Sequence, residues 1–177
     1  MHTQTVSLSL LPPSLVIMGV SGCGKSTVGR CVADKLGWPF LEGDALHSKE
    51  NIELMRQGVP LDDAMREPWL RAIADWIATQ VKAGRRGVIA CSALRRRYRD
   101  ILRTAQPELR FVWLHTDRDT FERRLTHRHQ HFMPASLLDS QLETLEPPGV
   151  GETAICLDAT EDIATLTAAS IAFANTR

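Results

Sequence analysis

Five short apolar runs recur along the chain, and each is separated from the next by a longer segment of mixed polarity. The runs are continuously apolar and do not alternate with polar residues, which is typical of parallel strands that are covered on both faces. We therefore expect five strands, at residues 15–19, 39–42, 87–91, 111–114 and 154–157.

The segments between these runs carry apolar residues at helical spacing. After the first run, Gly37 can end a stretch whose apolar residues share one helical face: Val28, Cys31, Val32 and Leu36. A long helix is expected over 69–81, with Pro68 near its first turn and Gly84 beyond its end. Further helices are expected over 94–102, 120–128, 134–142 and 161–173.

Strands that alternate with helices in this way predict an α/β domain with a doubly wound, parallel, five-stranded sheet and helices on both faces. Ligands of such sheets bind beyond the carboxyl ends of the strands. The residues that directly follow each expected strand are therefore the first candidates for a functional site.

The length of 177 residues suits one domain. We expect a flexible tail over 1–14 and a single domain over 15–177 that includes a lid at about 123–135. The charges balance at 21 basic against 21 acidic residues, which favours neither nucleic acid nor membrane as a partner. No apolar run is long enough for a membrane span, and no secretion signal is recognisable.

The four cysteines show no C-x-x-C spacing, and Cys91 and Cys156 lie within expected strands. They are interpreted as small core residues in a reducing compartment, which predicts a cytoplasmic protein.

The segment Gly19–Ser26 follows the first expected strand and has the phosphate-binding loop pattern of Gly, four residues, Gly-Lys-Ser. Its backbone N–H groups and the positive end of the next helix suit a nucleoside triphosphate. Lys25 can reach the outer phosphates, and the Ser26 hydroxyl can hold Mg²⁺; a chance glycine-rich turn is the alternative. The predicted nucleotide contacts here are Gly19, Val20, Ser21, Gly22, Cys23, Gly24, Lys25, Ser26 and Thr27.

Asp44 follows the second expected strand and is the preferred catalytic carboxylate. A kinase must orient an acceptor hydroxyl toward the γ-phosphate, and a carboxylate can accept the hydrogen bond and later the proton of that hydroxyl. The alternative is that Asp44 only caps a turn. A GTPase switch is disfavoured, because the chain has no Asn-Lys-x-Asp motif.

The basic segment 123–132 follows the fourth expected strand and resembles the arm of a lid over the nucleotide. Arg124 and Arg128 are predicted to contact ATP there, and Arg124 is also expected to neutralise charge in the transition state. A solvated helix face is the alternative. The segment also contains three histidines, of which only His127 and His131 would share a helical face. No carboxylate or cysteine lies beside them, which disfavours a metal site.

From about Leu15 to Ala174 the chain resembles the bacterial gluconokinases of the compact P-loop type. Several separate strings carry this resemblance, and together they are more specific than the phosphate loop alone. They are residues 18–26, Gly43-Asp44-Ala45-Leu46-His47, Asn51-Ile52, 58–63, Arg66-Glu67-Pro68-Trp69-Leu70, Cys91-Ser92-Ala93-Leu94, Tyr98-Arg99-Asp100, His131-Phe132-Met133 and 141–147.

The resemblance implies a fold like that of the nucleoside-monophosphate kinases, with Mg²⁺ and ATP, and transfer of the γ-phosphate to the 6-hydroxyl of D-gluconate. It also implies a homodimer. For such a substrate, Asp44, His47 and Ser92 can bind hydroxyls. Arg66 and Arg99 can meet the carboxylate.

Both arginines have alternatives: Arg66 can cap the long helix, and Arg99 can pair with Asp100 or another surface acid. The rival functions are a related kinase for shikimate or a nucleoside monophosphate, and a nucleotide-binding protein without catalysis.

Overall fold

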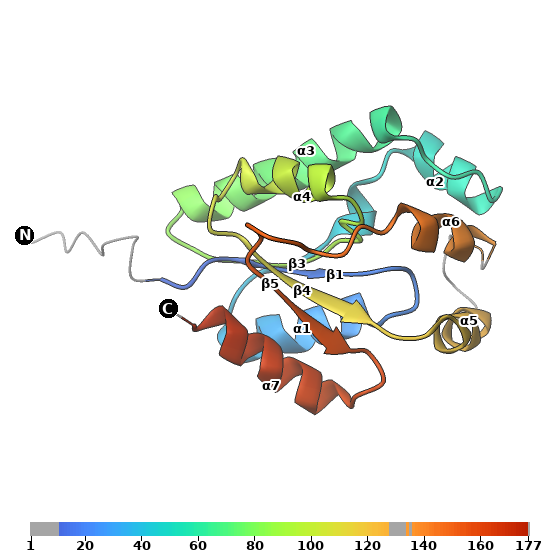
Figure 1. Ribbon diagram of the computed structural model, residues 1–177. Helices are drawn as coiled ribbons and strands as arrows, with labels where there is room; N and C mark the ends of the chain where they lie inside the picture. Colours follow the sequence, from blue (N-terminus) through green and yellow to red (C-terminus); the bar gives the residue numbers. More distant parts are fainter. Residues whose placement is uncertain (1–10, 128–133, 135, 177) are drawn as a thin grey trace, which may run out of the picture.

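A computed structural model describes residues 11–127, 134 and 136–176, and its centre is one five-stranded parallel sheet (Figure 1). The strands stand in the order β2-β3-β1-β4-β5. Their bounds are β1 Leu15–Met18, β2 Phe40–Glu42, β3 Val88–Ala90, β4 Arg110–His115 and β5 Ala154–Asp158. All five predicted strands and their parallel arrangement are thereby confirmed.

The central strand β1 shows why the apolar runs are continuous. All four of its side chains are fully buried, because helices cover both faces of the sheet. Leu15 and Ile17 enter one hydrophobic cluster, and Val16 and Met18 enter the other. The period-two alternation of a strand thus sends successive side chains into two cores.

Two helices cover each face of the sheet (Figure 1). On one face α1 (Lys25–Leu36) packs beside α7 (Ile163–Ala174), and on the other α3 (Asp63–Lys82) packs beside α4 (Arg96–Arg103). Three further helices gather at the edge where the strands end: α2 (Lys49–Arg56), α5 (Arg118–Thr126) and α6 (Leu137–Thr144). This edge is where a doubly wound sheet binds its ligands.

The expected start of the long helix needs correction. The helix α3 begins at Asp63 and not at residue 69, so Pro68 lies inside it. The carboxylate of Asp62 accepts the Met65 N–H at 2.8 Å and so caps α3 earlier than the apolar pattern suggested. The sequence reading also missed α2, whose residues are mostly polar, and the short 3₁₀ turn η2 at Gly43–Leu46.

The prediction that Cys91 and Cys156 are core residues is confirmed for Cys91 and wrong for Cys156. Cys91, beside the interior strand β3, is buried, and burial raises the pKa of its thiol to about 12. Cys156 is exposed, because β5 is an edge strand with one open side. The four cysteines are all free thiols.

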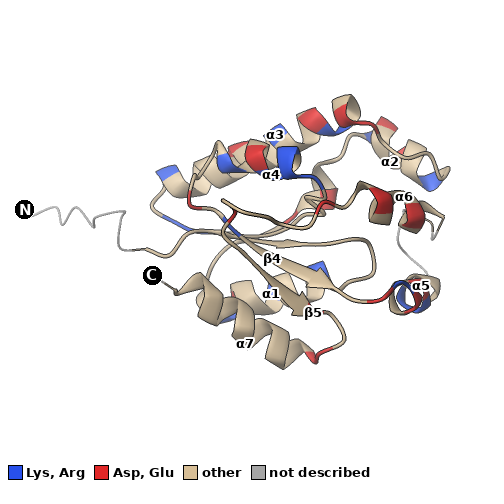
Figure 2. Cartoon of the chain, in the orientation of Figure 1, with Lys and Arg blue, Asp and Glu red and all other residues tan. Residues whose placement is uncertain are grey.

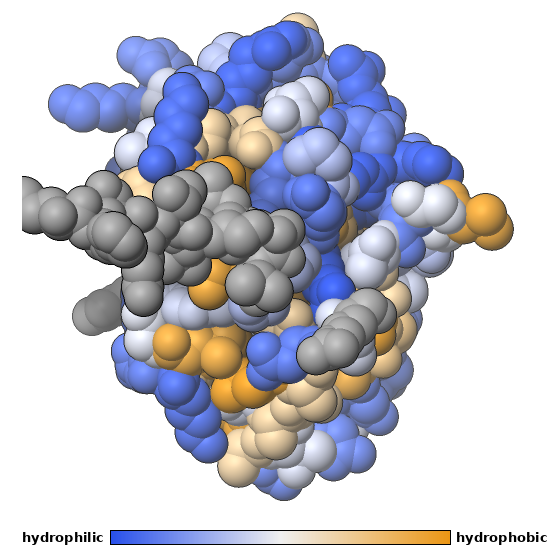
Figure 3. Space-filling model, turned by 90° about the vertical axis from the view of Figure 1, so that its left-hand side faces the viewer, coloured by the Kyte–Doolittle hydropathy of each residue, from blue (hydrophilic) through white to orange (hydrophobic). Residues whose placement is uncertain are grey.

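Charge is distributed unevenly over the helices. Acidic and basic residues are mixed on α3, α4 is mainly basic, and α7 has no charged residue along its length (Figure 2). The face opposite the ligand edge is accordingly hydrophilic over α3 and α4 and more apolar below them (Figure 3). Within the part of the chain that the structure describes, no helix is both long and apolar enough to cross a membrane.

Candidate active site

The phosphate loop lies between β1 and α1, where glycine is required for geometric reasons. Gly24 caps the N-terminus of α1 with φ of 97°, a left-handed conformation that favours glycine. Gly19 has φ of 143°, and a Cβ atom there would lie 2.6 Å from the carbonyl oxygen of Leu114. Glycine at these two positions therefore allows the loop to reach its tight curve.

The Lys25 side chain folds back over the loop. Its Nζ donates to the carbonyl oxygen of Val20 at 3.0 Å and lies 3.9 Å from the sulfur of Cys23. The ammonium group is thus held beside the curve in which phosphates would sit. Ser26 and Thr27 follow in the first turn of α1, whose dipole adds positive potential at the same place.

A cavity of about 480 Å³ opens on one side of the phosphate loop, a size that suits a nucleoside. Arg124 of α5 forms part of its wall and donates to the carbonyl oxygen of Ala159 at 2.6 Å. Its other nitrogen lies 3.4 Å from the carbonyl oxygens of Gly22 and Cys23. Arg124 therefore stands between the phosphate loop and the β5–α7 connection, as a nucleotide contact requires. Arg128 and most of the expected lid, residues 128–133 and 135, lie outside the described residues.

A second cleft lies on the other side of the loop and brings together most of the predicted acceptor residues. Its polar walls come from the phosphate loop, η2, α3, the β3–α4 loop and α6: Ser21, Lys25, Asp44, His47, Arg66, Ser92 and Gln141. The space inside is only about 30 Å³, which is room for one water. A wider hollow of about 420 Å³ adjoins it and shares Leu61 and Arg66 as wall residues.

His47 and Trp69 form the floor of the narrow cleft. Their rings stack with centroids 4.1 Å apart, and the indole N–H donates to the carbonyl oxygen of Gly43 at 2.7 Å. Burial lowers the pKa of His47 to about 4, although the Asp44 carboxylate opposes this shift; Arg66 adds to it. His47 is therefore neutral at neutral pH and suits a hydroxyl group better than a carboxylate.

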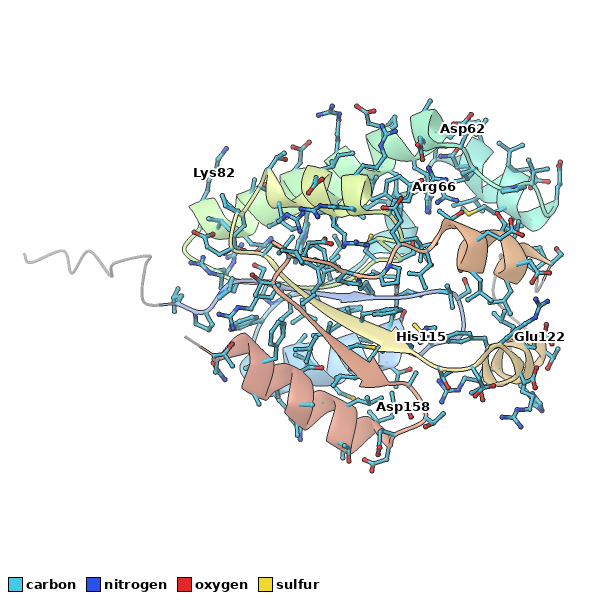
Figure 4. The ribbon with its side chains drawn as sticks, in the orientation of Figure 1. Asp62, Arg66, Lys82, His115, Glu122 and Asp158 are labelled. Atoms are coloured by element: carbon cyan, nitrogen blue, oxygen red, sulfur yellow. The ribbon has the colours of Figure 1, made fainter. Side chains whose placement is uncertain are left out.

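Arg66 lies on the first turns of α3 and faces the ligand edge, whereas Lys82 lies at the far end of the same helix (Figure 4). The Arg66 guanidinium donates to the Tyr98 hydroxyl at 3.3 Å, and its central carbon lies 5.5 Å from the centroid of the Tyr98 ring. Tyr98 in turn donates to Asp63, which also accepts from Arg97 at 2.8 Å. Asp62, and not Arg66, caps α3, so the guanidinium is available to the cleft and the hollow.

The prediction that Arg99 binds the substrate is wrong. Its side chain is fully buried on the sheet side of α4, where it forms a two-pronged ion pair with Glu152 at 2.6 and 3.0 Å. Its remaining nitrogen donates to three carbonyl oxygens, those of Ala93, Leu94 and Glu146. The partner is therefore a buried acid and neither Asp100 nor another surface acid.

Sequence reasoning assigned no role to two residues of this cleft. Trp69 belongs to the string Arg66-Glu67-Pro68-Trp69-Leu70 that contributed to the family resemblance, and its hydrogen bond to Gly43 has no signal in the sequence. Gln141 belongs to the string 141–147 that contributed to the family resemblance, and that membership was the only signal available.

A phosphate loop at the end of β1, a nucleoside-sized cavity on one side and a polar cleft with a carboxylate on the other define a phosphate-loop kinase of small molecules. Comparison with known proteins supports this class. A family model described as shikimate kinase matches residues 21–147.

Closer relatives specify the family. A gluconokinase of Gluconobacter oxydans (strain 621H) is 50% identical over 155 residues, which are 88% of this chain and 87% of that protein. The crystal structure of a gluconokinase from Sinorhizobium meliloti 1021 shares 45% identity and a TM-score of 0.83, and covers 93% of this chain and 92% of that one. A sugar kinase from Janibacter sp. HTCC2649 shares 44% identity and a TM-score of 0.87, with 91% and 93% covered. The chain belongs to the gluconokinase family.

Proposed function

We propose that this protein transfers the γ-phosphate of ATP to the 6-hydroxyl of D-gluconate, which gives 6-phospho-D-gluconate and ADP. The observation that carries the proposal is the meeting of Lys25 and Asp44 in one cleft at the ligand edge of the sheet. One group suits the phosphate that leaves ATP, and the other suits the hydroxyl that receives it. Family membership supports gluconate as the acceptor.

The reacting end of the substrate would lie in the narrow cleft. Asp44 accepts a hydrogen bond from the 6-hydroxyl and receives its proton as the phosphoryl group arrives. Neutral His47 and Ser92 bind hydroxyl groups along the chain of the sugar acid. Because the cleft has room for one water, its walls must separate when the substrate enters.

The carboxylate end would lie toward the wider hollow. Arg66 is a wall residue of both spaces, and Arg95 lines the hollow with a weak ion pair to Asp63 at 3.5 Å. An open-chain sugar acid can therefore extend from Asp44 to a guanidinium that binds its carboxylate. Arg66 takes this role in the proposal, and Arg99 has none.

ATP binds with its triphosphate in the loop Gly19–Ser26 and its nucleoside in the cavity beside Arg124. Lys25 and Arg124 neutralise charge that develops on the transferred group. The Ser26 hydroxyl suits Mg²⁺, which keeps water and phosphate oxygens as its other ligands, and Asp44 can join this shell through one of the waters. When bound, the ion would neutralise phosphate charge and orient the triphosphate.

Three further features of the proposal follow from the sequence and the family: a single domain over 15–177, a homodimer, and a cytoplasmic location. The lid at about 123–135 would close over ATP, with Arg128 as a further contact; this part of the proposal concerns residues that are largely outside the described range.

The test is an ADP-release assay with purified protein, Mg²⁺, ATP and one of three acceptors: D-gluconate, shikimate or AMP. Gluconate is expected to support turnover, and ³¹P NMR of the product should place the phosphate on carbon 6. Lys25→Ala should abolish the signal, whereas Lys82→Ala, at the far end of α3, should leave it unchanged. Turnover on shikimate or AMP without turnover on gluconate would refute the proposal, and ATP binding without any transfer would favour a non-catalytic role.

A further inference from the structure

Gln141 of α6 is a buried polar residue that forms two hydrogen bonds with the phosphate loop. Its side-chain oxygen accepts the Ser21 N–H at 2.7 Å, and its side-chain nitrogen donates to the Ser21 hydroxyl oxygen at 3.2 Å. The residue is 7% exposed, and the two partners are 120 positions apart in the chain. A buried carboxamide that satisfies both of its ends on one residue fixes the relative position of the two segments.

The place of this contact links it to the reaction. Ser21 and Gln141 both line the narrow cleft that contains Lys25 and Asp44. The contact therefore holds the phosphate loop on the side that faces the acceptor, and not on the side of the nucleoside cavity.

The segment that follows α6 holds the opposite wall of the same cleft. The N–H of Glu146 donates to the carbonyl oxygen of Leu94 at 2.8 Å, and its carboxylate accepts the Arg96 N–H at 2.7 Å. These contacts fix the β3–α4 loop, which also contains Ser92. Residues 141–146 thus tie the phosphate loop and the acceptor loop to one short piece of chain.

We propose that Gln141 is a positioning residue for phosphoryl transfer, which holds Ser21 and the phosphate loop in register with the hydroxyl bound at Asp44. The inference rests on the proposed function. Transfer in line between two oxygens is sensitive to displacements of about 1 Å, whereas binding of a triphosphate by many N–H groups is not. Loss of the hydrogen bonds between Gln141 and Ser21 should therefore impair phosphoryl transfer to the acceptor more than it impairs nucleotide binding.

The experiment compares Gln141→Met with Gln106→Met. Gln106 is the matched control, because it is 5% exposed and its side-chain oxygen accepts the Ser14 N–H at 3.1 Å before β1, at the opposite edge of the sheet. Gln141→Met is expected to lower kcat for gluconate about 10- to 100-fold. KM for ATP should stay within about threefold of wild type. The number of phosphorylated gluconate molecules formed per ADP should fall below one, because water competes with gluconate for the phosphoryl group.

The control variant should keep the wild-type kcat and a yield of one, even if its thermal stability falls. Wild-type kcat in a folded Gln141→Met protein, or an equal loss of kcat in both variants, would overturn the inference. If Gln141→Met fails to fold, Gln141→Asn keeps the carboxamide but is one methylene too short for Ser21, and wild-type kcat in that variant would overturn it equally. Failure of the wild-type protein to phosphorylate gluconate would instead refute the proposed function.

Discussion

Arg99 and Glu152 form an ion pair that solvent does not reach, with their side chains 0% and 1% exposed. Arg103 adds a contact to the same carboxylate at 3.2 Å. Arg99 also binds the carbonyl oxygen of Ala93, the one residue other than glycine with positive φ, 45°, among those the structure describes. The pair thus secures a strained loop that immediately follows Ser92, a proposed substrate contact.

Removal of one charge from this pair should cost much stability. Glu152→Gln leaves the Arg99 guanidinium buried without its counter-charge, so the free energy of unfolding should fall by about 3–5 kcal/mol. Chemical denaturation monitored by circular dichroism measures the loss. The control is Glu122→Gln, which breaks an exposed pair with Arg118 and should cost less than about 1 kcal/mol. Equal losses in both variants would contradict the assignment.

The same pair should make stability depend on acid pH. Burial alone would raise the pKa of Glu152, but hydrogen bonds from Arg99, the Gly149 N–H and Arg103 outweigh it and lower the pKa to about 2. Between pH 4.5, the ordinary value for Glu, and pH 2, the unfolded chain binds a proton that the folded protein does not. Stability is therefore lost as pH falls through this window, and Glu152→Gln should remove this contribution.

His47 should remain neutral throughout the physiological range. With its pKa lowered from 6.5 to about 4, an NMR titration of its ring should show a midpoint near pH 4, assigned with a His47→Gln variant. Between pH 6.5 and 4 the unfolded chain binds the proton, so acidification in this window favours unfolding. A midpoint near 6.5 would mean that the ring is hydrated and not packed on Trp69.

Gly43→Ala should displace the catalytic carboxylate. A Cβ atom at this position would lie 2.5 Å from the carbonyl oxygen of Ala90, so η2 and Asp44 must shift away from β3. We expect kcat/KM for gluconate to fall at least about tenfold, with KM for ATP nearly unchanged. Gly149→Ala, where a Cβ meets nothing within 4 Å, is the steady-state kinetic control. Wild-type kinetics in Gly43→Ala would show that the turn tolerates displacement.

Asp44→Asn tests the proposed base directly. The amide keeps the shape but cannot take the proton of the acceptor hydroxyl, so kcat should fall about 10²- to 10⁴-fold. KM for gluconate should change little, since the loss falls on the transition state. Asp75→Asn, an exposed position on α3, should keep wild-type rates. Near-normal turnover by the Asp44 variant would remove this residue from the role of base.

The local motif and the alternation of elements were enough to predict the sheet, the phosphate loop and Asp44. A phosphate loop depends on residues adjacent in the chain, and parallel strands bring their following residues to one edge whatever the details of packing. Asp44 and Lys25 could therefore be placed at one edge of the sheet from the alternation of strands and helices alone.

Roles that depend on the direction of a side chain from a helix could not be predicted in this way. Arg66 and Arg99 have the same chemistry, but α3 turns one toward the cleft and α4 turns the other into the core against Glu152. Cys91 and Cys156 both lie at apolar strands, and only the strand order makes one interior and the other edge. The hydrogen bonds between Gln141 and Ser21 join residues 120 positions apart in the chain, and no local sequence pattern encodes them. The sequence by itself determined which chemistry is present, because motifs and hydrophobic periodicity are local properties. The tertiary structure decided which of these groups reach the site, because burial and contact depend on how distant elements pack.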